Sequence, residues 1–267
     1  MKDYTYNPKT NYNIEENDWT KCLTKFANFM LVLCFIITSV VIYFFSTYQF
    51  AQIDGDSMFP TLNGSFRNTK ISDIAYYTSF KPTNKGDIVI VDYFSSGIED
   101  SNNYEAIKRI IATGGDTIYY YAGNIFVNDK KLDEPYIENG YQFIKHNYSL
   151  EEAENWKNNG YKKSKVNFEN WCKQLYENQP TTEKTEFFIN YQTKYNSCIT
   201  YDEVLKTYVL TLPKNFVYFL GDNRGLSKDS SLVGPVEEKY ITAKVDFIVE
   251  NNRDIFTHLW VKFVELF

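Results

Sequence analysis

The sequence predicts a mainly β protein with one membrane-spanning helix near its N-terminus. Short apolar runs alternate with turn residues over much of the chain, which is typical of strands joined by tight turns. Tyrosine and phenylalanine, both good strand formers, number 23 and 21, against 12 glycines and 7 prolines. A long uncharged segment precedes these strands. We therefore expect an antiparallel β-sheet or barrel-like domain behind a single anchor, with a helix-containing insertion.

The uncharged segment contains the run FANFMLVLCFIITSVVIYFF, which is long enough to cross a bilayer as a helix and too long for a typical core helix. We assign 26–50 to a transmembrane anchor and 1–25 to a cytoplasmic tail. Lys21 and Lys25 precede the segment, whereas the next basic residue is Arg67, so the N-terminus is expected in the cytoplasm. No small-x-small cleavage site follows, which favours an uncleaved anchor. The sequence thus predicts a single-pass protein of the plasma membrane with an extracellular domain.

The strand pattern covers 51–135 and 205–250, which we assign to one extracytoplasmic domain. Predicted strands within it include Ile88–Val91, Thr117–Tyr121 and Phe216–Leu220. Each is a short apolar or aromatic run, and turn residues separate it from its neighbours.

An insertion, 136–204, separates the two blocks. It is rich in Asn, Tyr and Lys, and helix-compatible stretches occur at Ser149–Lys157 and Lys165–Tyr176. The insertion contains Cys172 and Cys198, and the sequence does not decide whether they form a disulfide. The last segment, 251–267, has apolar residues at helical spacing, which predicts an amphipathic helix that lies in the membrane interface or covers the barrel.

Composition excludes several functions. The net charge of −6 argues against nucleic acid as a partner, because phosphate binding needs clustered Lys and Arg. The chain has only two histidines, His146 and His258, and its four cysteines include no CxxC pair. We therefore expect no metal site and no cofactor.

Three segments carry residues suited to catalysis: GDSMFPTL at 55–62, AIKRIIATGGD at 106–116 and GDNRGLSKDSS at 221–231. Taken alone, Ser57 is an ordinary turn serine. Lys108 lies among apolar residues, where a lysine usually extends its ammonium group to solvent.

Together with KGDIV at 85–89 and DEPY at 133–136, these segments resemble, in order, the type I signal peptidases, the membrane-anchored serine proteases that remove signal peptides. The single anchor is most similar to the Gram-positive form. The resemblance implies the signal-peptidase catalytic fold, with Ser57 as nucleophile, Lys108 as general base and Ser227 as a hydroxyl that orients the lysine. It also implies, as partners, signal-peptide-bearing preproteins, the lipid bilayer and proximity to the secretion translocon.

A Ser–Lys pair is chemically reasonable in a chain with two histidines. A lysine with its ordinary pKa of about 10.4 is protonated at neutral pH and cannot accept a proton. Burial disfavours the charged form, and the apolar neighbours of Lys108 are compatible with burial. A neutral lysine can then remove the proton of a serine hydroxyl and later activate a water molecule.

The resemblance also predicts a shallow apolar pocket for the small residues of a signal peptide, lined by Ile53, Gly55, Met58, Leu62 and Ile107. Each of these apolar side chains could equally be plain core. Gly55 stands where some members carry an oxyanion-binding serine. Ser231 stands where the family usually has an arginine that pairs with Asp229.

Two other functions compete with this interpretation. A tethered adhesion protein would use the insertion for binding, but it would have no need to keep both Ser57 and Lys108. A self-cleaving repressor of related fold would be soluble and bind DNA, which the anchor and the net charge oppose.

Overall fold

The computed structural model describes residues 18–64, 72–79, 83–98, 104–138, 149–177 and 198–250. It divides into two units, Met1–Tyr48 and Gln49–Phe267. The predicted amphipathic segment 251–267, most of the tail and part of the insertion lie outside the described residues.

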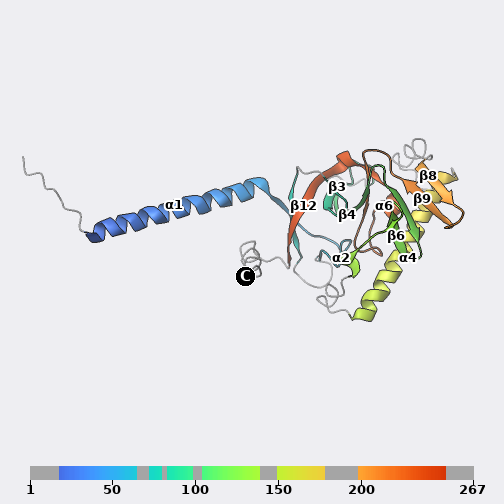
Figure 1. Cartoon of the computed structure of the whole chain (residues 1–267), viewed down its shortest axis with the longest axis horizontal. Coiled ribbons are helices and arrows are strands. Elements are labelled where there is room, and N and C mark those ends of the chain that lie inside the picture. The colour runs from blue at the N-terminus through green and yellow to red at the C-terminus, as the bar shows by residue number, and fades with distance from the viewer. Residues whose placement is uncertain are drawn as a thin grey trace, which may run out of the picture. The chain divides into compact units, whose positions relative to one another are not determined.

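The first unit consists of α1 (Asp18–Thr47), a helix of 30 residues that is long and apolar enough to cross a membrane (Figure 1). None of its residues, all of which are described, is buried within the protein. The helix begins inside the predicted tail, so Lys21 and Lys25 form part of its first turns. It ends before the predicted limit of the anchor, because Gln49 already begins a strand.

The second unit contains two antiparallel sheets, which confirms the mainly β fold. Within the described residues the larger sheet has seven strands in the order β1 (Gln49–Gln52), β2 (Ile74–Thr78), β12 (Ile241–Val249), β3 (Ile88–Asp92), β4 (Glu105–Thr113), β10 (Phe216–Leu220) and β11 (Val236–Glu237). The smaller has five, in the order β7 (Lys130–Lys131), β6 (Asn124–Val127), β5 (Thr117–Tyr121), β9 (Thr207–Thr211) and β8 (Ile199–Asp202). The strands predicted at Thr117–Tyr121 and Phe216–Leu220 have the expected bounds.

The insertion contributes one long helix, α4 (Leu150–Tyr176). Ser149 and Glu152 form a capping box that satisfies the first free N–H groups and fixes where the helix begins. The two helical stretches predicted from the sequence are therefore joined into one. The insertion also ends earlier than predicted, because β8 pairs with β9 in the smaller sheet.

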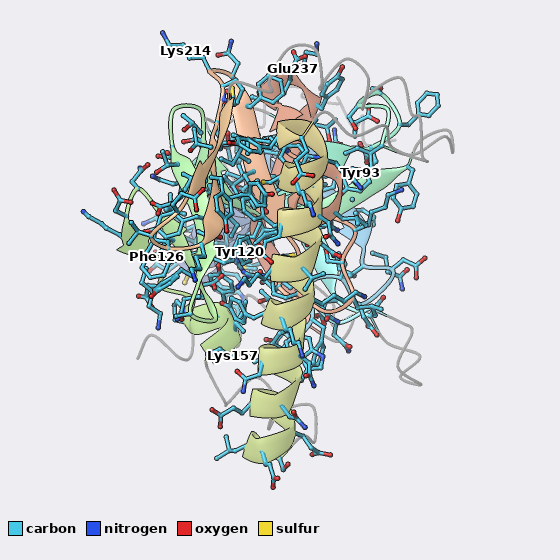
Figure 2. All side chains as sticks on the ribbon, turned by 90° about the vertical axis from the view of Figure 1, so that its right-hand side faces the viewer. Tyr93, Tyr120, Phe126, Lys157, Lys214 and Glu237 are labelled. Atoms are coloured by element: carbon cyan, nitrogen blue, oxygen red, sulfur yellow. The ribbon has the colours of Figure 1, made fainter. Side chains whose placement is uncertain are left out.

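Helix α4 lies against the strands and closes the largest core (Figure 2). Its buried side chains Phe168, Trp171 and Leu175 pack with Tyr120 and Tyr218 of the two sheets. Cys172 lies in this core as a free thiol, so it forms no disulfide with Cys198. The insertion helix is thus an integral part of the domain.

Three short helical turns complete the described domain: α2 (Pro135–Glu138), α6 (Ser230–Val233) and the 3₁₀ turn η2 (Glu238–Tyr240). Figure 1 shows α2 and α6 close to the strands of the larger sheet. Each of them begins inside a sequence segment that carries the family resemblance, α2 at the end of DEPY and α6 at the end of GDNRGLSKDSS.

Candidate active site

Ser57 lies in the loop between β1 and β2, which folds back on itself. Two turn hydrogen bonds, from Phe59 N to Asp56 O at 3.1 Å and from Leu62 N to Met58 O at 3.0 Å, shape the segment that follows the serine. At its base the backbones of Gly55 and Gly64 touch, since a Cβ at Gly64 would lie 2.2 Å from Gly55 O. We call residues 55–64 the nucleophile loop.

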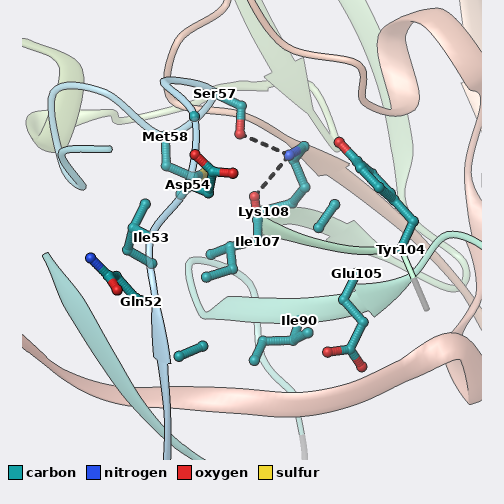
Figure 3. A pocket seen from close by; sticks show the side chains of 13 residues that line it. Gln52, Ile53, Asp54, Ser57, Met58, Ile90, Tyr104, Glu105, Ile107 and Lys108 are labelled. Atoms are coloured by element: carbon teal, nitrogen blue, oxygen red, sulfur yellow. Dashed lines mark hydrogen bonds between the residues drawn. The ribbon is translucent and has the colours of Figure 1, made fainter. Parts of the chain in front are cut away.

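Lys108 lies at the centre of β4, which pairs with β3 on one side and β10 on the other. Only 3% of its surface is exposed. Its Nζ lies 3.0 Å from Ser57 Oγ and donates a 2.9 Å hydrogen bond to Ile107 O (Figure 3). The fold therefore brings together two residues that are 51 positions apart in the sequence.

The surroundings of Lys108 favour its neutral form. Burial lowers its pKa to about 8, although the negative charges of Asp229 and Asp222 act in the opposite direction. At that pKa about a tenth of the lysine is neutral at pH 7. The ring of Tyr93, whose centroid lies 5.8 Å from Nζ, covers one side of the amine, and its electron-rich face acts in the same direction as the two carboxylates. An amine in this state can accept a proton from the adjacent hydroxyl.

Two buried ion pairs lie beside the lysine. Arg109, its neighbour in the chain, donates to both carboxylate oxygens of Asp222 at 2.9 and 2.7 Å. Arg224 pairs with Glu134, and both side chains are almost fully buried. Tyr136 stacks under the guanidinium of Arg109 at 3.8 Å. The DEPY segment singled out in the sequence therefore supplies partners to both arginines.

Residues 221–225, which we call the GDNRG segment, connect these ion pairs to the nucleophile loop. Asn223 N donates to Ser57 O at 3.0 Å, and its side-chain Nδ2 donates to Asp56 O at 3.0 Å. Asp222 also accepts a short hydrogen bond from Thr61 Oγ1. The serine backbone is thus held by the same segment that pairs with the strand of the lysine.

Asp229 shows how this sequence accommodates the missing arginine. Its carboxylate accepts from Gly221 N at 2.9 Å and caps α6 through Ser231 N at 3.1 Å. Ser231 Oγ donates a further hydrogen bond of 2.8 Å. A neutral hydroxyl therefore lies where the resemblance implies an arginine, and Ser231 leaves the charge of Asp229 uncompensated.

Ser227 lies next to the pair without a hydrogen bond to it. Its Oγ is buried and has no partner among the described residues. A Cβ at Gly221 would lie 2.3 Å from this Oγ and 2.4 Å from Ser57 O, so glycine is required where residues 221–227 meet the backbone of Ser57. The structure thus places Ser227 at the edge of the site, with a free hydroxyl.

A pocket of about 250 Å³ opens on one side of the Ser57–Lys108 pair. Four of the five expected lining residues, Ile53, Gly55, Met58 and Ile107, border it, as Figure 3 shows in part. Leu62 is not among its lining residues, because it is fully buried in the core behind Ile53 and Met58.

A second pocket of about 330 Å³ lies on another side of the pair. Its lining includes Asp54, Asp56, Tyr93, Leu226 and Lys228, so it has one more aromatic ring than the first pocket. Ser57 and Lys108 border both cavities.

Several lining residues were not found from the sequence. Tyr104 borders both pockets, and its ring lies beside Lys108 in Figure 3. Glu105 and Ile90 border the first pocket only. Side chains alternate along a strand, so Tyr104 lies on the same face as Ala106 and Lys108, which follow it by two and four residues. This alternation is the sequence signal that could have identified Tyr104 as a lining residue.

Comparisons with known proteins identify the family of the chain. The family model described as "Signal peptidase, peptidase S26" matches residues 23–250. The chain is 26% identical over 234 residues to signal peptidase I of Streptococcus pneumoniae serotype 4, covering 86% of this chain and 94% of the relative. It is 27% identical over 217 residues to signal peptidase IB of Staphylococcus aureus strain Mu50, covering 81% and 84%.

A crystal structure of a signal peptidase I from Enterococcus faecalis V583 also matches, with 22% identity and a TM-score of 0.33, over 62% of this chain and 99% of that one. The family match and the curated relatives confirm the resemblance inferred from the sequence segments. The chain therefore belongs to the signal peptidase family, peptidase S26, and is a serine endopeptidase that removes signal peptides.

Proposed function

We propose that Ser57 and Lys108 carry out the cleavage of signal peptides in this protein. The observation that supports this most strongly is the 3.0 Å contact between the hydroxyl and an amine that is 3% exposed. Ser57 Oγ attacks the carbonyl carbon of the scissile bond, and Lys108 Nζ accepts the hydroxyl proton. The lysine then donates a proton to the departing amine of the mature chain, which leaves an acyl-enzyme on the serine.

Lys108 removes a proton from water in the second half of the reaction. The hydroxide oxygen attacks the ester carbon, the signal peptide leaves with a free carboxylate, and Ser57 regains its proton from the lysine. We assign the backbone N–H of Ser57 as one donor to the oxyanion. The unpaired Oγ of Ser227 supports its role as the hydroxyl that orients Lys108 once substrate fills the site.

The first pocket accounts for specificity in this proposal. Ile53, Gly55, Met58 and Ile107 present a small apolar surface that suits the short side chains at positions −1 and −3 of a signal peptide. Strand β1 is an edge strand of the larger sheet, so its outer side is open to an added strand within the described residues. The substrate then binds as an extended strand whose backbone supplies affinity and whose alternate side chains supply selectivity.

Helix α1 serves as the anchor in the plasma membrane. Lys21 and Lys25 lie in its N-terminal part, and no basic residue follows before Arg67, which supports a cytoplasmic N-terminus. The catalytic domain then lies on the outer side, where preproteins emerge from the translocon with their own apolar segment still in the bilayer.

The proposal is tested by comparing wild type, Ser57→Ala and Lys108→Ala in cleavage of a purified preprotein in detergent. Both variants are expected to lose at least about a thousandfold in kcat, because each removes one member of a pair that acts as a unit. Thr38→Ala in α1 is the matched control, since its hydroxyl bonds only to Cys34 O within the helix. Full activity of either site variant at neutral pH would refute the mechanism.

A further inference from the structure

We propose that helix α4 of the insertion positions the catalytic pair, by holding the GDNRG segment against the nucleophile loop. The inference rests on the proposed roles of Ser57 and Lys108. It gives the insertion a function in the reaction beyond its contribution to the core.

The tightest contact between α4 and the GDNRG segment is at Gly160. A Cβ there would lie 3.1 Å from Arg224 Cβ and 3.1 Å from Gly225 N. Glycine is a poor helix former, yet it stands in the middle of this long helix. Its lack of a side chain allows the segment to approach the helix backbone at this level.

Two further side chains of α4 fix the same segment. Lys163 Nζ donates a 2.8 Å hydrogen bond to Gly225 O. The ring of Tyr161 lies under the guanidinium of Arg224, 5.2 Å from its carbon. Helix α4 therefore holds both residues that contact Gly160: Gly225 through its backbone oxygen, and Arg224 through its buried side chain.

The helix also contacts the nucleophile loop directly. Trp156 packs edge-on against Phe59 with ring centroids 6.0 Å apart, and Ala153 completes this small cluster. Phe59 is two residues after the nucleophile. The loop and the GDNRG segment thus share one rigid support, and the hydrogen bond from Asn223 N to Ser57 O joins them.

This arrangement makes the position of Ser57 depend on α4 through a short chain of contacts. Moving Gly225 by a few tenths of an ångström moves Asn223, and with it the backbone of Ser57. The distance from Ser57 Oγ to Lys108 Nζ then changes. Most of the lining of the first pocket stays in place, because it comes from β1, β3, β4 and the residues next to these strands, and only its Gly55 and Met58 side moves with the nucleophile loop. We therefore expect kcat to fall while KM is retained. Gly160 and Lys163 are positioning residues in this scheme.

The decisive experiment compares Lys163→Ala with Lys162→Ala in the full chain in detergent. Both lysines are exposed on α4, but only Lys163 donates to Gly225 O. Loss of that hydrogen bond is expected to lower kcat about two- to tenfold with KM unchanged, and Lys163→Arg, which keeps a donor, is expected to restore most of it. Lys162→Ala is expected to have wild-type kcat.

A second pair of variants separates positioning from folding. Gly160→Ala improves helix propensity and adds one methyl group at the contact with the GDNRG segment. Asn159→Ala, at the exposed position next to it, improves helix propensity without changing that contact. Lower kcat for Gly160→Ala at a Tm equal to or above wild type supports the inference. Wild-type kcat for both Gly160→Ala and Lys163→Ala overturns the inference. If Gly160→Ala does not fold, the kcat of Lys163→Ala decides by itself. An active Ser57→Ala protein would instead refute the proposed function.

Discussion

Arg109 and Asp222 form a two-pronged, buried ion pair that joins the strand of Lys108 to the segment that holds Ser57. The carboxylate is fully buried, and the guanidinium is about one tenth exposed. Both charges are also hydrogen-bonded to other groups, Arg109 to Gly86 O and Asp222 to Thr61. The relative position of Ser57 and Lys108 is therefore determined by this ion pair between neighbouring residues.

Replacing Asp222 by Asn is expected to lower the free energy of unfolding by about 3 to 5 kcal/mol, because it leaves Arg109 buried without its counter-charge. Chemical denaturation of the detergent-solubilised protein measures this. Lys244→Gln is the control, since its ion pair with Asp87 is partly exposed and is expected to contribute about 1 kcal/mol or less. Equal effects of the two variants would contradict a structural role for the buried pair.

The pH dependence of kcat/KM should follow the ionisation of Lys108. Because burial lowers its pKa to about 8, the neutral base is scarce at pH 6 and becomes dominant above pH 8. We expect kcat/KM to rise with pH and to level off with a midpoint near 8. A flat profile between pH 6 and 9 would indicate a different base.

Asp229→Asn is expected to move that midpoint to lower pH. The negative charge of Asp229 stabilises the charged form of Lys108 and raises its pKa, so removing the charge lowers the pKa further. Asparagine keeps an oxygen that can accept from Gly221 N. Ser231→Ala removes a hydrogen bond to the same carboxylate but no charge, and its profile should remain in place. A shift to higher pH in Asp229→Asn would disprove the electrostatic argument.

Lys108→Met should make the protein more stable at neutral pH. The folded pKa of about 8 is below the ordinary value of 10.5, so the unfolded chain binds more protons between these values. Wild type therefore carries a penalty below pH 8 that disappears as pH rises towards 10.5. We expect a gain of about 1 to 3 kcal/mol at pH 7 that shrinks at pH 10, measured by thermal unfolding. Lys162→Met, on the exposed side of α4, should change stability little at either pH.

Ile107→Ala tests the assignment of the first pocket. The side chain borders the cavity, whereas its carbonyl oxygen, which accepts from Lys108, is unaffected by the substitution. The variant is expected to cleave preproteins with Val or Leu at −1 or −3 that wild type cuts poorly. Ile248→Ala removes a side chain from the same core cluster but not from the pocket, and it should leave this preference unchanged.

The sequence predicted that Ser57 and Lys108 act together only through the resemblance of their segments to the type I signal peptidases, because each residue taken alone is ordinary. The structure places their side chains 3.0 Å apart, and their catalytic roles stay a prediction. The strands were predicted directly, since apolar runs and turn residues mark them. The ion pairs of Arg109 with Asp222 and of Arg224 with Glu134 were not predicted. They join positions about 90 to 110 residues apart, and local pattern carries no information on such contacts.

The insertion shows a second limit of prediction from sequence. Two separate helical stretches were predicted, and Asn158, Asn159 and Gly160, which are poor helix formers, lie between them. In the structure the helix continues through them. Gly160 faces the GDNRG segment, Ala153 before it packs in a small cluster with Phe59, and Tyr161 and Phe168 after it lie in the largest core. Tertiary packing outweighs propensity at this point.

The contact between Gly55 and Gly64 has a consequence for variation along the chain. Because the backbones meet there, residues 55–64 form a nearly closed ring, and hydrogen bonds between Asn63 and Asp73 fasten its end. We therefore expect that residues can be inserted between Gly64 and Asp73 without moving the Ser57 hydroxyl. Any side chain larger than hydrogen at position 64 would push the backbones of residues 55 and 64 apart, and we expect it to be absent from active signal peptidases with this loop.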